Sequence, residues 1–225
     1  MTVSNCANGT LMTFDKEYFR QFYGDYYLQN PSRKSGLYLE MIRRAMPHGR
    51  LLDIGCSFGM FLREATPYFS CVGMDVNPEV VAIAAENVPD ACFVAGKLPD
   101  IPCRGLDVIT ALDVIEHVHE PDAALIAIKN SLRPGGVALV VVPVYDGPLG
   151  FITGVLDKDP THLHKKSRRF WLDLAGRHFD VIDWQGFLRK LLFGKYYLHL
   201  PMRRLRSIAP AMGILLQRPL KDERG

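Results

Sequence analysis

The stretch Leu51-Leu-Asp-Ile-Gly-Cys-Ser-Phe-Gly59 decides the fold of this chain. Its first half is apolar and ends at Gly55, which predicts a buried strand followed by a sharp turn. Gly59 allows close approach of the backbone to a neighbour, and we expect a helix from Phe58 to Ala65. The N–H groups at the start of such a helix attract anionic groups. This turn is therefore the first candidate binding element.

Short apolar runs alternate with helical patterns along the middle of the chain. The expected strands lie at residues 51–55, 71–75, 91–95, 106–112 and 137–142, with two more at 179–184 and 211–217. The expected helices lie at 58–65, 78–87, 121–132 and 169–178. Apolar strands that alternate with helices imply βαβ units and a parallel sheet covered on both faces. Ligands of such sheets bind beyond the carboxyl ends of the strands. We therefore expect the functional residues in the loops at that edge.

The composition is that of a single globular domain. The chain has 225 residues, 48% hydrophobic and 23% charged, which excludes a disordered, collagen-like or coiled-coil protein. Its longest apolar run, at 137–144, is far shorter than the ~20 residues that span a bilayer. Five scattered cysteines and the lack of a signal sequence favour a reduced, cytoplasmic protein. A net charge of +3 is too small to indicate a DNA partner.

The second expected strand ends at an acidic residue, Asp75, about 20 residues after the first turn, the spacing at which a carboxylate binds ribose hydroxyls. The turn departs from the dinucleotide fingerprint G-x-G-x-x-G, because Ser57 stands in place of the middle glycine. A pyrophosphate pressed against this turn would meet that side chain. The sequence therefore favours an adenosyl ligand without a pyrophosphate over NAD.

Four segments follow the order of a known family: residues 51–59, Gly73-Met-Asp-Val-Asn-Pro-Glu79, residues 106–118 and Leu132-Arg-Pro-Gly-Gly136. They resemble the motifs of class I S-adenosylmethionine-dependent methyltransferases, in the branch with the ubiquinone-biosynthesis O-methyltransferases and the sugar and natural-product enzymes. The resemblance implies an α/β, Rossmann-like single domain with a seven-stranded, mostly parallel sheet and helices on both faces. It also implies S-adenosylmethionine as cofactor and S-adenosylhomocysteine as product.

We expect residues 48–225 to form this domain and residues 1–47 to form a helical cap. The aromatic stretch Phe14–Tyr27 suits a cap over the cofactor cleft, because aromatic side chains bury large areas; an ordinary helix packed on the sheet edge is the alternative. The resemblance further implies a set of cofactor-binding residues. Those near the methionine end and the sulfonium are Asp53, Gly55, Cys56, Gly59, Ala111 and Leu112, and those near the ribose and adenine are Asp75, Val76, Gly96, Lys97 and Leu98.

Methyl transfer to a hydroxyl gains from a general base, and histidine is the usual base near neutral pH. The preferred interpretation is O-methylation of a small-molecule or glycan-like acceptor with His162 or His164 as base, and His117 is a further candidate. Asp113, Glu116 and His117 share i, i+3, i+4 spacing and, together with His162 or His164, form a candidate magnesium site. The preferred interpretation requires no metal, because the Glu-His pair also occurs in family members without one.

Residues 187–207 contain six basic residues and no acidic ones. Because these alternate with Leu, Phe and Tyr, the segment fits a peripheral membrane surface or an anionic acceptor. The favoured interpretation is a helical insertion with a solvated basic face. The segment also keeps an RNA 2′-O-methyltransferase-like enzyme open as an alternative, although RNA is the less favoured partner because no RNA-binding module accompanies it. A catalytically inert SAM-binding protein is the other alternative.

Overall fold

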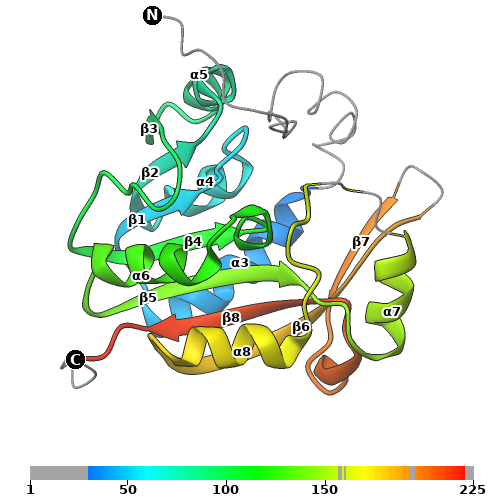
Figure 1. Cartoon of the computed structure of the whole chain (residues 1–225). Coiled ribbons are helices and arrows are strands. Elements are labelled where there is room, and N and C mark those ends of the chain that lie inside the picture. Colours follow the sequence, from blue (N-terminus) through cyan, green and yellow to red (C-terminus); the bar gives the residue numbers. More distant parts are fainter. Residues whose placement is uncertain (1–29, 157–158, 160, 193–195, 221–225) are drawn as a thin grey trace, which may run out of the picture.

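The computed structural model describes residues 30–156, 159, 161–192 and 196–220 (Figure 1). The aromatic stretch Phe14–Tyr27 lies outside this part. Within it, one sheet contains the strands β1 (Gly49–Ile54), β2 (Phe69–Asp75), β3 (Cys92–Ala95), β4 (Leu106–Leu112), β5 (Leu132–Pro143), β6 (Asp180–Leu192), β7 (Tyr196–Pro201) and β8 (Ala211–Gln217).

The described helices alternate with these strands. They are α3 (Ser32–Ala45), α4 (Met60–Ala65), α5 (Pro78–Asn87), α6 (Pro121–Ser131), α7 (Gly147–Leu156) and α8 (Arg168–Gly176), with short 3-10 helices η1 (Ile115–His117) and η2 (Arg206–Ile208). As predicted, Asn77 caps α5: its side chain accepts the Glu79 N–H at 2.9 Å, and Pro78 occupies the first turn. Among the helices that the structure describes, none combines the length and apolarity needed to cross a membrane.

The strand order is β3-β2-β1-β4-β5-β8-β6-β7. The first five strands are parallel to one another, and β8 runs antiparallel between β5 and β6. The carboxyl ends of the five parallel strands therefore meet at one edge. The predicted α/β class, with a mostly parallel sheet, is confirmed.

Each face of the sheet is covered by its own apolar core. Side chains alternate along the strands, so that Leu52 and Ile54 pack toward α6 and α8, whereas Leu51 packs toward α3 and α4. Figure 1 shows α6 and α8 in front of the sheet and α3 behind it. Burial on both faces explains why the central strands are mostly apolar. Of the cap predicted at 1–47, the structure describes α3, which belongs to the rear layer.

The prediction of a helical insertion at 187–207 was wrong. β6 continues to Leu192 and β7 returns beside it, so the sheet has eight strands rather than seven. Phe187 is fully buried, where it stacks on the ring of His199 and meets Tyr38 of α3 edge-on. Packing in the sheet thus overrides the helical periodicity of this segment.

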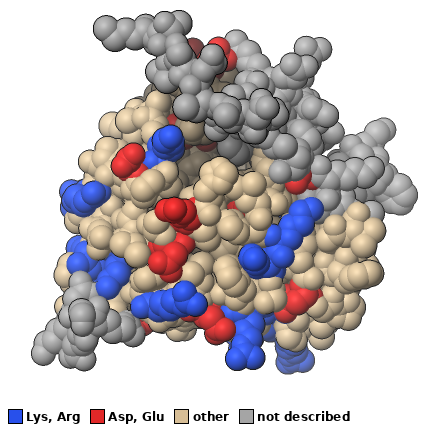
Figure 2. Space-filling view, in the orientation of Figure 1, with Lys and Arg blue, Asp and Glu red and all other residues tan. Residues whose placement is uncertain are grey.

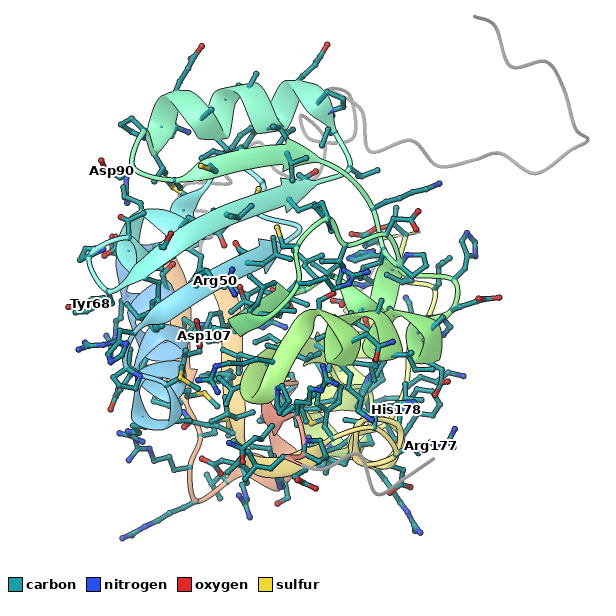
Figure 3. All side chains as sticks on the ribbon, turned by 90° about the vertical axis from the view of Figure 1, so that its left-hand side faces the viewer. Arg50, Tyr68, Asp90, Asp107, Arg177 and His178 are labelled. Atoms are coloured by element: carbon teal, nitrogen blue, oxygen red, sulfur yellow. The ribbon has the colours of Figure 1, made fainter. Side chains whose placement is uncertain are left out.

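The amino ends of the strands carry charged residues that pair with one another. Arg50 of β1 and Asp107 of β4 lie side by side at this edge (Figure 3), and the Arg50 N–H donates to Asp107 Oδ2 at 2.8 Å. Arg133 Nε donates to the other carboxylate oxygen at 2.6 Å. Burial alone would raise the pKa of Asp107, but these donors lower it below its ordinary value.

Candidate active site

A cavity of about 1300 Å³ opens at the carboxyl ends of the parallel strands. Its walls are the loops that follow β1, β2, β3, β4 and β5, together with residues of α3, α7 and β6. This is the edge at which the sequence predicted ligand binding, and the volume exceeds that of most small-molecule sites, ~300–1,000 Å³. The cavity is large enough for a cofactor and an acceptor together.

The turn after β1 is held against β2 by its backbone. The Gly55 N–H donates to the Met74 carbonyl at 2.7 Å, and Gly55 has a φ of +70°. A Cβ at this position would lie 2.4 Å from the Val114 side chain, so glycine is required for both reasons. Ser57 also has a positive φ, 46°, and its N–H donates to Asp75 Oδ2 at 3.0 Å. The turn therefore joins the ends of the first two strands.

Two buried carboxylates face the cavity from these strand ends. Asp53 is 2% exposed and accepts a hydrogen bond from Thr110 Oγ1 at 2.6 Å. Burial raises the pKa of Asp53 to about 7, and the nearby charge of Asp75 adds to this, although the Thr110 hydroxyl opposes it. Burial likewise raises the pKa of Asp75, which accepts the backbone N–H groups of Ser57 and Asn77. Neither carboxylate has an ion pair within the described residues.

Most residues implied for the cofactor lie in the cavity wall. These are Asp53, Gly55, Cys56, Asp75, Val76, Gly96, Lys97, Leu98 and Leu112. The other two do not line it. Gly59 begins α4 at a φ of +79° and packs against Val88, and Ala111 belongs to the core beneath α6.

His117 and His162 both line the cavity, with ring centroids 4.7 Å apart. His164, also predicted as a base, lies outside the cavity wall. Its N–H donates to the Glu116 carbonyl at 3.2 Å, and its Nε2 is 2.9 Å from the Val118 carbonyl oxygen. His164 therefore fastens its loop to the segment after β4 and does not face an acceptor in this cavity.

The hydrogen bonds of His117 decide which ring nitrogen carries the proton. Its Nδ1 is 2.9 Å from the carbonyl oxygen of Thr161, which can only accept, so Nδ1 is the donor. The Thr161 hydroxyl, also 2.9 Å from Nδ1, itself donates to Asp159 at 2.6 Å. Burial lowers the pKa of His117, and His162 lowers it further. The ring is therefore neutral near pH 7, with its acceptor lone pair on Nε2.

Glu116 is a fully buried acid in the same wall. Neither carboxylate oxygen has a hydrogen-bond partner among the described residues. Burial raises the pKa of Glu116 well above its ordinary value, and the charge of Asp113 raises it further. One ligand atom each of Glu116, His117 and His162 lies within 4.8 Å of the others. Oxygen and nitrogen donors in this arrangement could hold a divalent cation.

Asp113 does not join that group, although the sequence placed it in a candidate metal site with Glu116, His117 and either His162 or His164. It adopts a φ of +59°, and its carboxylate accepts from the Arg189 guanidinium at 2.5–2.6 Å and lies 3.7 Å from Lys34 Nζ. Burial alone would raise the pKa of Asp113, but Arg189 and Lys34 hold it far below its ordinary value. The helical spacing predicted for these residues is also absent, because η1 is a single 3-10 turn.

Arg189 and Tyr145 are polar residues of the cavity wall that sequence reasoning did not place there. Arg189 was expected on a solvated face, yet it lines the cavity because β6 extends past it. Tyr145 was not considered; its hydroxyl is 3.1 Å from His162 Nδ1. Its position two residues after the carboxyl end of β5 was the available signal.

Several known proteins resemble this chain in sequence. A family model described as a methyltransferase domain matches residues 26–191. The ubiquinone biosynthesis O-methyltransferase of Xanthomonas campestris is 30% identical over 103 residues, which is 42% of this chain and 43% of that enzyme. A dTDP-3-amino-3,6-dideoxy-alpha-D-glucopyranose N,N-dimethyltransferase of Streptomyces fradiae is 33% identical over 107 residues, 44% of this chain and 42% of the relative. A tRNA U34 carboxymethyltransferase of Azotobacter vinelandii is 30% identical over 49% of this chain and 39% of its own length. The chain thus spans less than half the length of these relatives.

Solved structures share the fold. A Thermotoga maritima protein, described as a SAM-dependent methyltransferase and possible histamine N-methyltransferase, superposes with a TM-score of 0.68 at 18% identity, covering 90% of this chain and 97% of that one. A SAM-dependent methyltransferase from Methanosarcina mazei gives a TM-score of 0.62 at 15% identity, covering 80% and 98%. Since the family model matches well over half of the residues and the sheet and cavity have the expected arrangement, this chain belongs to the methyltransferase domain family, with the fold of the class I S-adenosylmethionine-dependent enzymes.

Proposed function

We propose that this chain transfers a methyl group from S-adenosylmethionine to a hydroxyl of a small-molecule or glycan-like acceptor. One observation carries the proposal: the acidic strand ends Asp53 and Asp75 and the histidine pair His117 and His162 line a single cavity. When bound, the cofactor supplies a methyl group on a positively charged sulfur. The protein then has to position the acceptor and remove its proton.

The residues of this cavity fit the cofactor. Two backbone N–H groups hold the Asp75 carboxylate in place, and its remaining lone pairs suit the two ribose hydroxyls. The hydroxyl oxygen of Ser57 is buried in the cavity wall without a hydrogen-bond partner among the described residues, as expected of a polar atom that a ligand satisfies. Lys34 of α3 lies in the same wall and would meet the carboxylate of the methionine part.

We assign the base to His117. Since Nδ1 carries the proton, Nε2 can accept the proton of an acceptor hydroxyl. Asp159 and Thr161 orient the ring from its Nδ1 side, because the Thr161 hydroxyl bridges the Asp159 carboxylate and His117 Nδ1. His162, fixed by Tyr145, is the second ring of the pair and the alternative base.

The names of two of the three relatives support a small acceptor, whereas the third is named for tRNA modification. The Xanthomonas enzyme is named for O-methylation in ubiquinone biosynthesis, and the Streptomyces enzyme for N-methylation of a nucleotide-linked amino sugar. The proposal of a hydroxyl rests on the neutral histidine in the wall, because an unprotonated amine needs no general base whereas a hydroxyl gains from one.

Transfer of radiolabelled methyl groups tests the proposal. The full chain is incubated with labelled S-adenosylmethionine and, separately, a catechol, a sugar with free hydroxyls, an amino sugar and RNA. Label in the catechol or the sugar is the expected result. Label confined to the amino sugar or to RNA would overturn the hydroxyl assignment. Calorimetric binding of S-adenosylhomocysteine without turnover of any acceptor would instead indicate an inert cofactor-binding protein.

A second candidate is a metal-assisted form of the same reaction. The unpartnered carboxylate of Glu116 favours it, because a buried carboxylate without a hydrogen bond is costly unless a cation or donor satisfies it. In this form Glu116, His117 and His162 bind a divalent cation that orients the acceptor oxygen.

Chelation and one substitution separate the two forms. Activity that EDTA abolishes and Mg²⁺ or Mn²⁺ restores, together with its loss in Glu116→Gln, would establish the metal-assisted form. Activity that is indifferent to EDTA and retained by Glu116→Gln would leave His117 as a simple base.

A further inference from the structure

Helix α7 exposes an apolar face to solvent. Phe151 is 70% exposed, Val155 67% and Ile152 51%. The helix sequence, Gly-Pro-Leu-Gly-Phe-Ile-Thr-Gly-Val-Leu from Gly147 to Leu156, contains no charged residue. Single exposed apolar side chains are ordinary, but three on one uncharged helix form a candidate interaction surface.

Two further apolar side chains extend this face. Leu205 is 58% exposed and directly precedes η2, which packs beside the first turn of α7, where a Cβ on Gly147 would lie 3.7 Å from the Ser207 carbonyl oxygen. Leu163 is 46% exposed, and its segment is tied to the residues before α7 by the hydrogen bond from the Tyr145 N–H to the Lys166 carbonyl. We call Phe151, Ile152, Val155, Leu163 and Leu205 the α7 patch.

In the described part of the chain, three exposed basic residues lie close in sequence to members of the α7 patch. Lys165 and Lys166 follow Leu163, and Arg206 follows Leu205. The acid that precedes the helix, Asp146, is already paired with Arg168 at 3.1 Å. In Figure 2 the right-hand side of the molecule is largely uncharged, and both basic and acidic side chains lie along its border. An apolar centre with a basic border is typical of surfaces that lie on anionic lipid.

The α7 patch also adjoins the cavity. Leu149, Ile152 and Thr153 of the same helix line the cavity wall, and Ile152 also belongs to the α7 patch, so the patch and the cavity wall meet at this residue. Contact of this helix with a lipid surface would bring this wall of the cavity close to that surface. An enzyme bound through this face would therefore hold its cavity near the lipid, which an apolar surface far from the cavity would not do.

We propose that the α7 patch and its basic border bind peripherally to an anionic lipid surface. A second copy of this chain fits less well, because a two-fold contact through the patch would bring the same lysines and arginines against one another. Of the basic segment 187–207, only its end, at Leu205 and Arg206, takes part. The contact is superficial, in agreement with the lack of a spanning helix among those described.

Sedimentation with vesicles tests the proposal. The full chain is mixed with vesicles of phosphatidylcholine alone, or of phosphatidylcholine and phosphatidylglycerol in equal parts. We expect binding to the second kind only. Phe151→Ser with Val155→Ser should lower the affinity about tenfold or more, because both side chains lose their burial in the interface. Lys165→Gln with Lys166→Gln should lower it about fivefold per residue and weaken its dependence on salt.

The matched control is Ile83→Ser with Val181→Ser, which removes two exposed apolar side chains, 38% and 37% exposed, from α5 and β6. It should bind as the unaltered chain does, and both apolar double variants should keep their methyl transfer to water-soluble acceptors. Absence of binding to phosphatidylglycerol vesicles would overturn the proposal, as would equal losses in the control. Self-association that disappears in Phe151→Ser with Val155→Ser would assign the patch to a second copy instead.

Discussion

The two edges of the sheet hold acidic side chains in opposite ways. At the amino ends of the strands, Asp107 accepts from the Arg50 N–H and pairs with the Arg133 guanidinium, and its pKa is lowered. At the carboxyl ends, Asp53, Asp75 and Glu116 are buried without an ion pair in the described part of the chain, and their pKa values are raised. The first arrangement stabilises the folded chain. The second destabilises it unless a ligand compensates, which is expected of a binding site.

Asp113 refines this comparison. It also lies at the carboxyl edge, yet Arg189 and Lys34 neutralise it. Its partners come from β6 and α3, so the ion pairs tie the strand extension and the first described helix to the loop after β4. A paired acid at this edge therefore has a structural role, and the unpaired acids are the candidates for ligand contact.

The largest expected effect comes from the proposed base. His117→Ala should lower turnover of a hydroxyl acceptor by roughly 10²–10⁴-fold, because the acceptor then loses its general base. Binding of S-adenosylhomocysteine should change little, which steady-state kinetics together with calorimetry can establish. Turnover at the normal rate in His117→Ala, with a large loss in His162→Ala, would transfer the role to His162.

The next effect concerns stability. The pKa of Asp53 in the folded chain is about 7, against 3.8 for the ordinary group. Between these values the folded chain holds a proton that the unfolded chain has released, so the free energy of unfolding falls by ~1.4 kcal/mol per pH unit as the pH rises. Asp53→Asn removes this dependence and keeps an oxygen for the Thr110 hydroxyl.

Between pH 4 and pH 8, the free energy of unfolding of the cofactor-free wild-type chain should therefore fall by roughly 3–4 kcal/mol relative to that of the Asp53→Asn chain. Urea unfolding at the two pH values measures this gain. A difference in the free energy of unfolding between the two chains that stays constant with pH would show that Asp53 does not cause the pH dependence.

A smaller effect is expected at the ribose contact. Asp75→Asn should weaken binding of S-adenosylhomocysteine by about 10–100-fold, because hydrogen bonds to a charged acceptor are replaced by weaker ones. Calorimetry measures the affinity directly. Unchanged affinity would mean that the ribose lies elsewhere in the cavity.

The sequence was sufficient for the parallel half of the sheet. Leu51–Gly55 and Leu106–Leu112 could be recognised because strands buried on both faces are mostly apolar. It found the first half of β6, at 179–184, but failed in the second half, because Phe187–Leu192 has a helical spacing of apolar residues and only the pairing with β8 and β7 makes it a strand. Arg189 was consequently assigned to solvent.

The residues of the site could likewise be predicted only in part. Strand ends identify the turn at Gly55 and the acid at Asp75, but neighbouring strand residues point to opposite faces, and the sequence does not say which one faces the ligand. Leu112 therefore lines the cavity and Ala111 the core, although both were predicted. His162 and His164 could not be separated either, since their directions depend on contacts with Tyr145 and Val118 that are distant in sequence.

The smallest effect is expected from Asp107→Asn, at the paired edge. At neutral pH the free energy of unfolding of the variant should be lower by about 1 kcal/mol or less, because a partly exposed ion pair is screened by solvent. The pKa of Asp107 is lowered in the folded chain, so its contribution is present above the ordinary value and disappears as the pH falls through the folded pKa. Urea unfolding at neutral and acidic pH measures the loss and its disappearance. Because Asp107 lies at the opposite edge from the cavity, the affinity for S-adenosylhomocysteine and the turnover should equal those of the unaltered chain. A loss of affinity comparable to that of Asp75→Asn would show that the two edges are coupled, and the distinction between a structural and a functional edge would then not hold.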